Sequence, residues 1–289
     1  MHYTGNIIRP PSEADSIILQ VTVGCSHNRC TFCGAYKDTT FAIKPMELIE
    51  NDLLFAGQHF RDKTRLFLCD GDVLILSQIR LLRIFRAIRH HLPWIKRISL
   101  YANGKAMRNK DEKELSTLKD LGLDRIYTGL ESGCDRVLQR IQKGETAQNM
   151  IKAAQRINDI GIFLSVTVLL GIAGRKDSLR HGVDTAETLN KMAPRQIGAL
   201  TYMPMANTPL GQEVERNTFQ LLYPREILRE LLVLINNLDL NRCQFHANHS
   251  SNYLPISGRL AKDKQLLMAT VTRALQGELS INPDYIRSL

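Results

Sequence analysis

The sequence lacks any long uncharged apolar segment. Its longest such stretch, residues 160–174, is interrupted by glycine, serine and threonine and is shorter than the roughly 20 residues that a transmembrane helix needs. The first six residues have neither the basic start nor the apolar run of a secretory signal. We therefore expect a cytoplasmic protein that does not associate with membranes and whose cysteines are not paired in disulfides.

Two common nucleotide-binding signatures are also missing. No Gly-x-x-x-x-Gly-Lys-Ser/Thr match occurs, and no Gly-x-Gly-x-x-Gly follows a predicted strand. Internal repeats and low-complexity tracts are absent too, and the content of 44% hydrophobic and 23% charged residues is ordinary for a globular protein. These absences exclude the commonest P-loop and dinucleotide-binding proteins and a disordered chain.

The chain is basic, with 38 Lys and Arg against 29 Asp and Glu and a net charge of +9. Such a balance favours an anionic small-molecule substrate or a polyanion as partner. The basic residues are dispersed over predicted helices, and no separate RNA-binding module is present. The charge is therefore compatible with a nucleic-acid partner, but the sequence contains no nucleic-acid-binding module that would support one.

Three cysteines, Cys25, Cys30 and Cys33, lie within nine residues directly after the apolar run 17–23. Three thiolates on one short loop suit an iron–sulfur cluster in which one iron is left open for a cofactor or substrate. Structural zinc is the alternative, because His27 could supply a fourth ligand. At this point both metal centres remain open.

Strand-like and helical patterns alternate six times along the chain. The predicted strands are residues 17–23, 65–68, 98–101, 125–127, 162–170 and 197–201. Such alternation predicts parallel βα units with right-handed crossovers. Eight units would complete a barrel, so we predict an α/β protein with an incomplete (β/α)6 TIM-like barrel and a C-terminal, mainly helical extension.

The pattern divides the chain into three predicted parts. Residues 1–16 form an N-terminal extension, residues 17–210 the partial barrel, and residues 211–289 a helical cap. In the cap, the polar stretch 241–252 is predicted to be a loop between two amphipathic helices. We expect its His249 or Asn252 to contact the substrate, because uncharged hydrogen-bonding groups orient polar molecules at little desolvation cost.

Glycine and polar residues follow the predicted strands. They are Asp70-Gly71-Asp72, Asn103-Gly104, Glu131-Ser132-Gly133 and Gly171 to Gly174. In parallel α/β folds the carboxyl ends of the strands carry the chemistry. We therefore expect these segments and the cysteine loop to converge on one active site.

With these segments in view, the chain resembles the radical S-adenosylmethionine (SAM) enzymes. The resemblance is carried by Cys30-Thr31-Phe32-Cys33, by residues 129–138, by Lys143-Gly144 and by residues 170–174. It points to the branch containing oxygen-independent coproporphyrinogen oxidase, the elongator-type acetyltransferase and methylthiotransferases. In one respect the chain departs from the common pattern, since four residues rather than three separate its first two cysteines.

The resemblance implies a [4Fe-4S] cluster on Cys25, Cys30 and Cys33, with SAM chelated to the fourth iron. It also implies a set of SAM contacts, namely Phe32, Gly71, Asp72, Tyr101, Asn103, Glu131, Lys143 and Thr167. Among these, Gly71 and Asp72 would meet the methionine amino group and Lys143 the methionine carboxylate. Tyr101 or Asn103 would face the ribose, and Phe32 would lie near the adenine.

The predicted function is reductive cleavage of SAM to a 5′-deoxyadenosyl radical, which abstracts hydrogen from an unidentified substrate. A one-electron donor such as flavodoxin or ferredoxin would be required. A radical methyltransferase or tRNA-modifying enzyme is an alternative within the same chemistry. A non-catalytic zinc or iron–sulfur binding protein is the alternative of another class.

Overall fold

The computed structural model describes residues 1–288. The chain forms two compact units. The first contains Met1–Asn28, Ala35–Thr128 and Arg156–Leu164, and the second contains Arg29–Gly34, Gly129–Gln155 and the described chain from Ser165 onward. The cysteine loop therefore supplies Cys25 to the first unit and Cys30 and Cys33 to the second.

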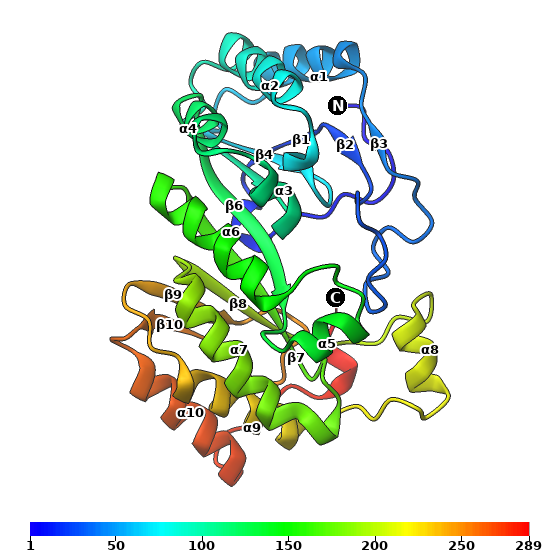
Figure 1. The fold of residues 1–289 in the computed structure, drawn as a ribbon, viewed down its shortest axis with the longest axis vertical. Helices are drawn as coiled ribbons and strands as arrows, with labels where there is room; N and C mark the ends of the chain where they lie inside the picture. The colour runs from blue at the N-terminus through cyan, green and yellow to red at the C-terminus, as the bar shows by residue number, and fades with distance from the viewer. Residues whose placement is uncertain (289) are drawn as a thin grey trace. The chain divides into compact units, whose positions relative to one another are not determined.

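Parallel strands form the sheet of the first unit (Figure 1). Their order is β1 (Ile17–Gln20), β4 (Arg65–Cys69), β5 (Arg97–Tyr101) and β6 (Leu123–Glu131), and each neighbouring pair is parallel. The last three residues of β6 belong to the second unit. A short antiparallel pair, β2 (Thr22–Val23) with β3 (Ala42–Ile43), flanks the cysteine loop on both sides in the sequence.

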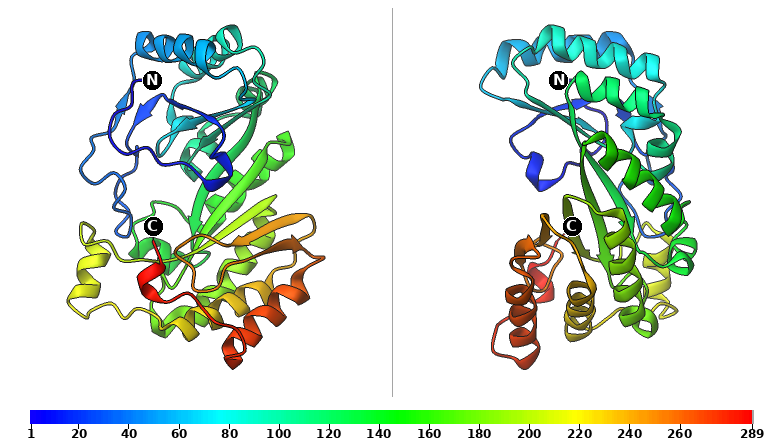
Figure 2. Two further views of the ribbon diagram at one scale, coloured as in Figure 1. Left: turned by 180° about the vertical axis from the view of Figure 1, so that it is seen from behind. Right: turned by 60° about the vertical axis from the view of Figure 1, so that its left-hand side comes forward.

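Helices alternate with these strands along the chain. They are α1 (Met46–His59), α2 (Gln78–His91), α3 (Gly104–Asn109) and α4 (Glu112–Asp120), with single 3-10 turns at Pro11–Glu13 and Val73–Ile75. Ser77 caps the start of α2, and the helix buries Leu81, Ile84, Phe85 and Ile88 at helical spacing. Burying each such side chain contributes roughly 1.5 to 3 kcal/mol. Helices α1 and α2 lie side by side in Figures 1 and 2.

The second unit continues the α/β pattern, but its last strand is antiparallel. Strands β7 (Phe163–Leu170), β8 (Gln196–Thr201) and β9 (Cys243–Ala247) pair in parallel, and β10 (Ile256–Leu260) pairs antiparallel with β9. The first two residues of β7 belong to the first unit. Its helices are α5 (Asp135–Arg140), the first part of α6 (Ala147–Ile160), α7 (Ser178–Met192), α8 (Pro209–Glu215), α9 (Pro224–Asn237) and α10 (Lys264–Gln276). Two 3-10 turns, Arg175–Asp177 and Asp284–Ile286, complete it. Helix α9 packs between α7 and α10 (Figure 2).

The predicted α/β class is confirmed, and each of the six predicted strands is found as β1, β4, β5, β6, β7 or β8. The stretch 241–252 was predicted to be a loop, but it contains strand β9. Cys243, Phe245 and Ala247 are fully buried there while the residues between them are half-buried, an alternation typical of a strand. The predicted domain boundaries after residues 16 and 210 remain predictions.

Among residues 1–288, no helix is both long enough and apolar enough to cross a membrane.

Candidate active site

The turn after β4 lies directly against the first cysteine. A Cβ atom added to Gly71 would lie 2.7 Å from the Cβ of Cys25, which no side chain tolerates. The Gly71 amide also donates to the Gly24 carbonyl at 3.1 Å. Glycine is required here because the two backbones approach so closely. The turn therefore fixes the start of the cysteine loop.

Asp72, next in this turn, is fully buried and accepts several hydrogen bonds. Ser26 Oγ and Asn103 Nδ2 each donate to its Oδ2 at 2.7 Å. Asn103 Oδ1 in turn accepts from the Ala106 amide at 2.7 Å and so caps helix α3. These bonds connect the turn after β4 with Asn103, at the start of α3, and both places were predicted to contact SAM.

Burial raises the pKa of Asp72 from 3.8 to about 6, although the Ser26 and Asn103 hydrogen bonds act in the opposite direction. The folded protein therefore holds this proton at pH values where the unfolded chain has released it, and its free energy of unfolding falls as pH rises from about 4 to 6. In Asp72→Asn this contribution disappears. We expect the variant to gain stability relative to wild type by up to about 3 kcal/mol between pH 4 and 7. Urea unfolding at several pH values measures the difference, and parallel pH profiles would contradict the prediction.

Backbone hydrogen bonds anchor the other two cysteines within the second unit. The Thr31 amide donates to the Ile141 carbonyl at 2.9 Å, and the Leu210 amide donates to the Thr31 carbonyl at the same distance. Asn207 Nδ2 donates to the Gly34 carbonyl at 3.2 Å. The segment that carries Cys30 and Cys33 is thus held between the end of α5 and the start of α8.

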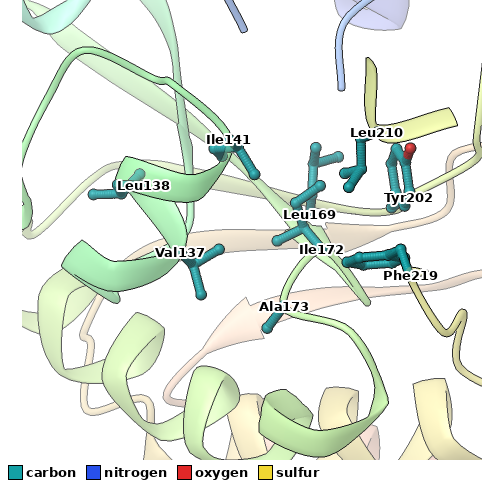
Figure 3. Packing of buried hydrophobic residues seen from close by; sticks show 9 residues of the cluster. All are labelled: Val137, Leu138, Ile141, Leu169, Ile172, Ala173, Tyr202, Leu210 and Phe219. Carbon is teal, nitrogen blue, oxygen red and sulfur yellow. The ribbon is translucent and has the colours of Figure 1, made fainter. Parts of the chain in front are cut away.

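A hydrophobic cluster supports this segment. It consists of Val137, Leu138, Ile141, Leu169, Ile172, Ala173, Tyr202, Leu210 and Phe219 (Figure 3). Phe32, between the two cysteines, is partly buried and packs against the cluster. The ring therefore orients the loop through packing, in addition to any contact with a cofactor.

The strongest electrostatic feature beside Cys30 and Cys33 is a pair of opposite charges. Lys143 Nζ lies 2.8 Å from Glu131 Oε1, and the two side chains are only 14% and 11% exposed. Burial alone would lower the pKa of the Lys143 ammonium, but Glu131, Cys30 and Cys33 favour its charged form and raise the pKa overall. Glu131 has a positive φ of 64°, an uncommon conformation that is often found at functional sites. Lys143 therefore remains cationic beside two thiols.

Sequence reasoning missed the residue that holds the Gly171 turn. Glu230, on α9, is fully buried, and its Oε1 accepts from the Gly171 amide at 3.0 Å. The same oxygen lies 2.9 Å from Nδ1 of buried His181. The available signal was a carboxylate on the otherwise apolar face of an amphipathic helix, where a buried charge needs specific partners.

The remaining predicted SAM contacts lie on strands. The Tyr101 ring packs edge-on against Phe67 at 5.1 Å and near Tyr127 at 6.0 Å, and burial raises the pKa of its hydroxyl. Thr167 is half-buried in the middle of β7. Their roles toward SAM stay predictions.

The two predicted substrate contacts are held by hydrogen bonds within the second unit. Asn252 is buried, accepts from Thr201 Oγ1 at 2.8 Å and donates to the Ala199 carbonyl at 2.9 Å. His249 Nδ1 lies 2.9 Å from Ser251 Oγ, and burial lowers the pKa of this imidazole. Asn252 thus fastens the segment after β9 to β8, and a substrate role for either residue stays a prediction.

The cysteine loop carries a set of three sulfur donors. The thiols of Cys25, Cys30 and Cys33 are not paired in disulfides and are partly accessible, and three soft thiolates are the ligands that an iron–sulfur cluster requires. Within the described chain, no three His, Cys, Asp or Glu side chains already converge as a metal site. In their chemistry, the residues on the loop nevertheless fit the cluster.

A parallel α/β protein with three cysteines, none of them in a disulfide, on the loop after its first strand belongs to a recognisable class of metalloenzymes. The family model of the radical SAM superfamily matches residues 19–187, more than half of the chain. The chain belongs to this superfamily.

One curated relative is 4′-phospho-dehydrooxetanocin synthase from Priestia megaterium, which is 26% identical over 209 residues. The match covers 65% of this chain but only 28% of that protein. The similarity therefore concerns only a small part of that relative's length.

Solved structures share the fold. The radical SAM methyltransferase TsrM from Kitasatospora setae, with cobalamin and a [4Fe-4S] cluster bound, matches with a TM-score of 0.58 and 17% identity over 70% of this chain and 39% of its own. Coproporphyrinogen III oxidase from Escherichia coli matches with a TM-score of 0.56 and 16% identity. The match covers 76% of this chain and 51% of that protein. Elp3 from the archaeon Methanocaldococcus infernus matches with a TM-score of 0.53 and 14% identity. The match covers 91% of this chain and 63% of that protein. At these identities the three structures show that the chain shares their fold.

Membership in the superfamily brings its cofactors, a [4Fe-4S] cluster and SAM.

Proposed function

We propose that this protein reductively cleaves SAM and uses the resulting radical to abstract hydrogen from a substrate that is still unidentified. The observation that carries the proposal is the buried Glu131–Lys143 pair beside Cys30 and Cys33. A fixed cation at this position suits the carboxylate of a cofactor bound next to the thiolates. Structural zinc needs no such neighbour, and nothing in the zinc alternative explains the pair.

In this proposal Cys25, Cys30 and Cys33 hold the cluster. When bound, the reduced cluster supplies the electron that splits SAM into methionine and a 5′-deoxyadenosyl radical. Lys143 binds the methionine carboxylate and Asp72 accepts from the methionine amino group. The Gly71 turn keeps side chains away from Cys25, as its contact with that residue suggests.

The other proposed SAM contacts surround the nucleoside. Phe32 and its backbone meet the adenine, Tyr101 or Asn103 the ribose, and Thr167 the ribose or the methionine. Asn103 already donates to Asp72 and caps α3. It would therefore contribute by fixing Asp72 as well as by any contact of its own.

Radical SAM chemistry requires an electron donor and a substrate. We propose that a flavodoxin or a ferredoxin donates the electron. We also propose that the protein acts in the cytoplasm. The net charge of +9 favours an anionic small molecule as substrate. Binding of a nucleic acid would fit the charge but has no dedicated module to support it.

Methyl transfer is a second candidate reaction, because TsrM, one structural neighbour, is a methyltransferase. The two reactions differ in the fate of the SAM methyl group. SAM labelled in that methyl group distinguishes them: the label leaves in methionine after simple hydrogen abstraction and enters the product after methyl transfer.

We expect the anaerobically reconstituted and dithionite-reduced protein to release 5′-deoxyadenosine and methionine from SAM. The physical reason is that an electron reaching the sulfonium breaks its bond to the 5′ carbon. Chromatography measures both products, and iron and acid-labile sulfide analysis verifies the cluster. The control is a protein with all three loop cysteines replaced by alanine. A complete cluster that yields no more 5′-deoxyadenosine than this control would contradict the proposal and favour a non-catalytic iron–sulfur protein.

A further inference from the structure

The second unit contains a cavity of about 610 Å³ that none of the proposed cluster or SAM contacts lines. Its walls come from the ends of β7 and β8, from residues 214–227 and from residues 253–287. Pockets that enclose small organic molecules commonly measure about 300 to 1,000 Å³. The cavity therefore has the size of a ligand site.

Two arginines in the wall are each stacked on a tyrosine. The Arg175 guanidinium lies 4.1 Å from the Tyr223 ring centre, and the Arg287 guanidinium lies 3.8 Å from that of Tyr253. All four residues line the cavity. A planar guanidinium held over an aromatic ring is rigid, so it loses little conformational entropy when it binds an anion.

Hydrogen bonds hold both guanidinium groups in place. Arg175 donates to Glu226 Oε2 at 3.0 Å and to the Leu221 carbonyl at 2.8 Å. Arg287 donates to the Ser251 carbonyl at 2.7 Å and to Asp284 Oδ1 at 2.6 Å, and its side chain is only 7% exposed. These bonds use two of the five N–H groups of each arginine, which leaves three for a ligand.

Another wall is aromatic and apolar. The rings of Tyr202 and Phe219 meet edge to face at 6.2 Å, and Figure 3 shows them next to each other at the margin of the hydrophobic cluster. Both line the cavity, as do Leu221 and Ile227. Such a wall favours a flat ring over a flexible polar chain.

We propose that this cavity binds a small molecule that combines an aromatic or heteroaromatic ring with a carboxylate or phosphate group. The ring packs against Tyr202 and Phe219, and the anion accepts hydrogen bonds from Arg175 and Arg287. Each arginine is paired with one carboxylate, Arg175 with Glu226 and Arg287 with Asp284, so the anion binds through the N–H groups that these pairs do not use. The site is separate from the proposed SAM contacts and its occupation needs neither cluster nor reductant.

Calorimetry with three probes tests this ligand class: 1-naphthyl phosphate, 1-naphthol and inorganic phosphate. We expect saturable binding of 1-naphthyl phosphate. Its affinity should be at least about tenfold higher than that of 1-naphthol, which lacks the charge, and than that of inorganic phosphate, which lacks the ring. Arg287→Gln and Arg175→Gln should each weaken it by about tenfold or more, because each removes charge-assisted hydrogen bonds. Arg287→Lys retains the charge but loses the planar fork and should be intermediate.

Arg216→Gln is the matched control, because this neighbouring arginine is exposed and does not line the cavity. Thermal melts show which variants are folded, and only folded variants are compared. Equal binding of 1-naphthol, equal losses in the Arg216 variant, or no saturation at millimolar probe would each overturn the proposal. Displacement of the probe by SAM would also overturn it, since the cavity would then belong to the cofactor site.

Discussion

Cys30→Ala is expected to abolish both the cluster absorbance and the release of 5′-deoxyadenosine. The cluster loses one of its three thiolate ligands in this variant, and the remaining two thiolates are too few to retain it. Thr31 and Phe32 hold the loop through the Ile141 carbonyl and the hydrophobic cluster, so the fold should persist. Iron and sulfide content, visible absorbance and product chromatography measure the effect.

Cys243→Ala is the matched control for this variant. Like Cys30, Cys243 is not in a disulfide, but it is fully buried in β9, and burial raises its pKa to about 12. Its loss should cost some packing energy and leave cluster content unchanged. A Cys30→Ala protein that retained a full cluster and SAM cleavage would show that the loop cysteines are not the ligands.

Lys143→Ala should weaken SAM binding by about tenfold to a hundredfold, the effect of removing a charged hydrogen bond of roughly 1.5 to 3 kcal/mol. It should also lower the free energy of unfolding by about 3 kcal/mol, because Glu131 is left as a largely buried charge without its partner. Cluster content should not change. Calorimetric titration with SAM and urea unfolding measure the two effects separately.

Arg83→Ala tests whether these effects are specific to the buried pair. Arg83 lies 3.5 Å from Glu50, and both side chains are well exposed, so its loss should cost less than about 1 kcal/mol. A Lys143→Ala protein with wild-type affinity for SAM would assign the pair a purely structural role.

The sequence predicted strands β1 and β4 to β8 well. Helices α2 and α9 have the sequence pattern of amphipathic helices, because their apolar residues repeat every three or four positions and a capping serine or a proline marks the start. Strand β9 was missed, since Gln244 and His246 gave the stretch a polar composition that concealed the alternation of Cys243, Phe245 and Ala247. Composition and periodicity disagreed there, and periodicity was the correct guide.

Prediction of the site was more uneven. The pairing of Glu131 with Lys143, the anchoring of Phe32 and the close fit of Gly71 against Cys25 all involve residues that the sequence motifs had singled out. Glu230 was not found because its partners, Gly171 and His181, lie 49 or more positions away in the sequence. Contacts of this kind depend on tertiary packing and have no local signature.

The bond from Glu230 to Gly171 has a consequence for attempts to shorten the protein. A version that stopped after β8 would retain all three loop cysteines, yet it would lack α9 and leave the Gly171 amide and buried His181 without their carboxylate. It would also expose the edge of β8 that β9 normally covers, and such bare edges promote aggregation. The C-terminal third therefore cannot be trimmed away as a dispensable appendage, and a minimal catalytic fragment would have to include it.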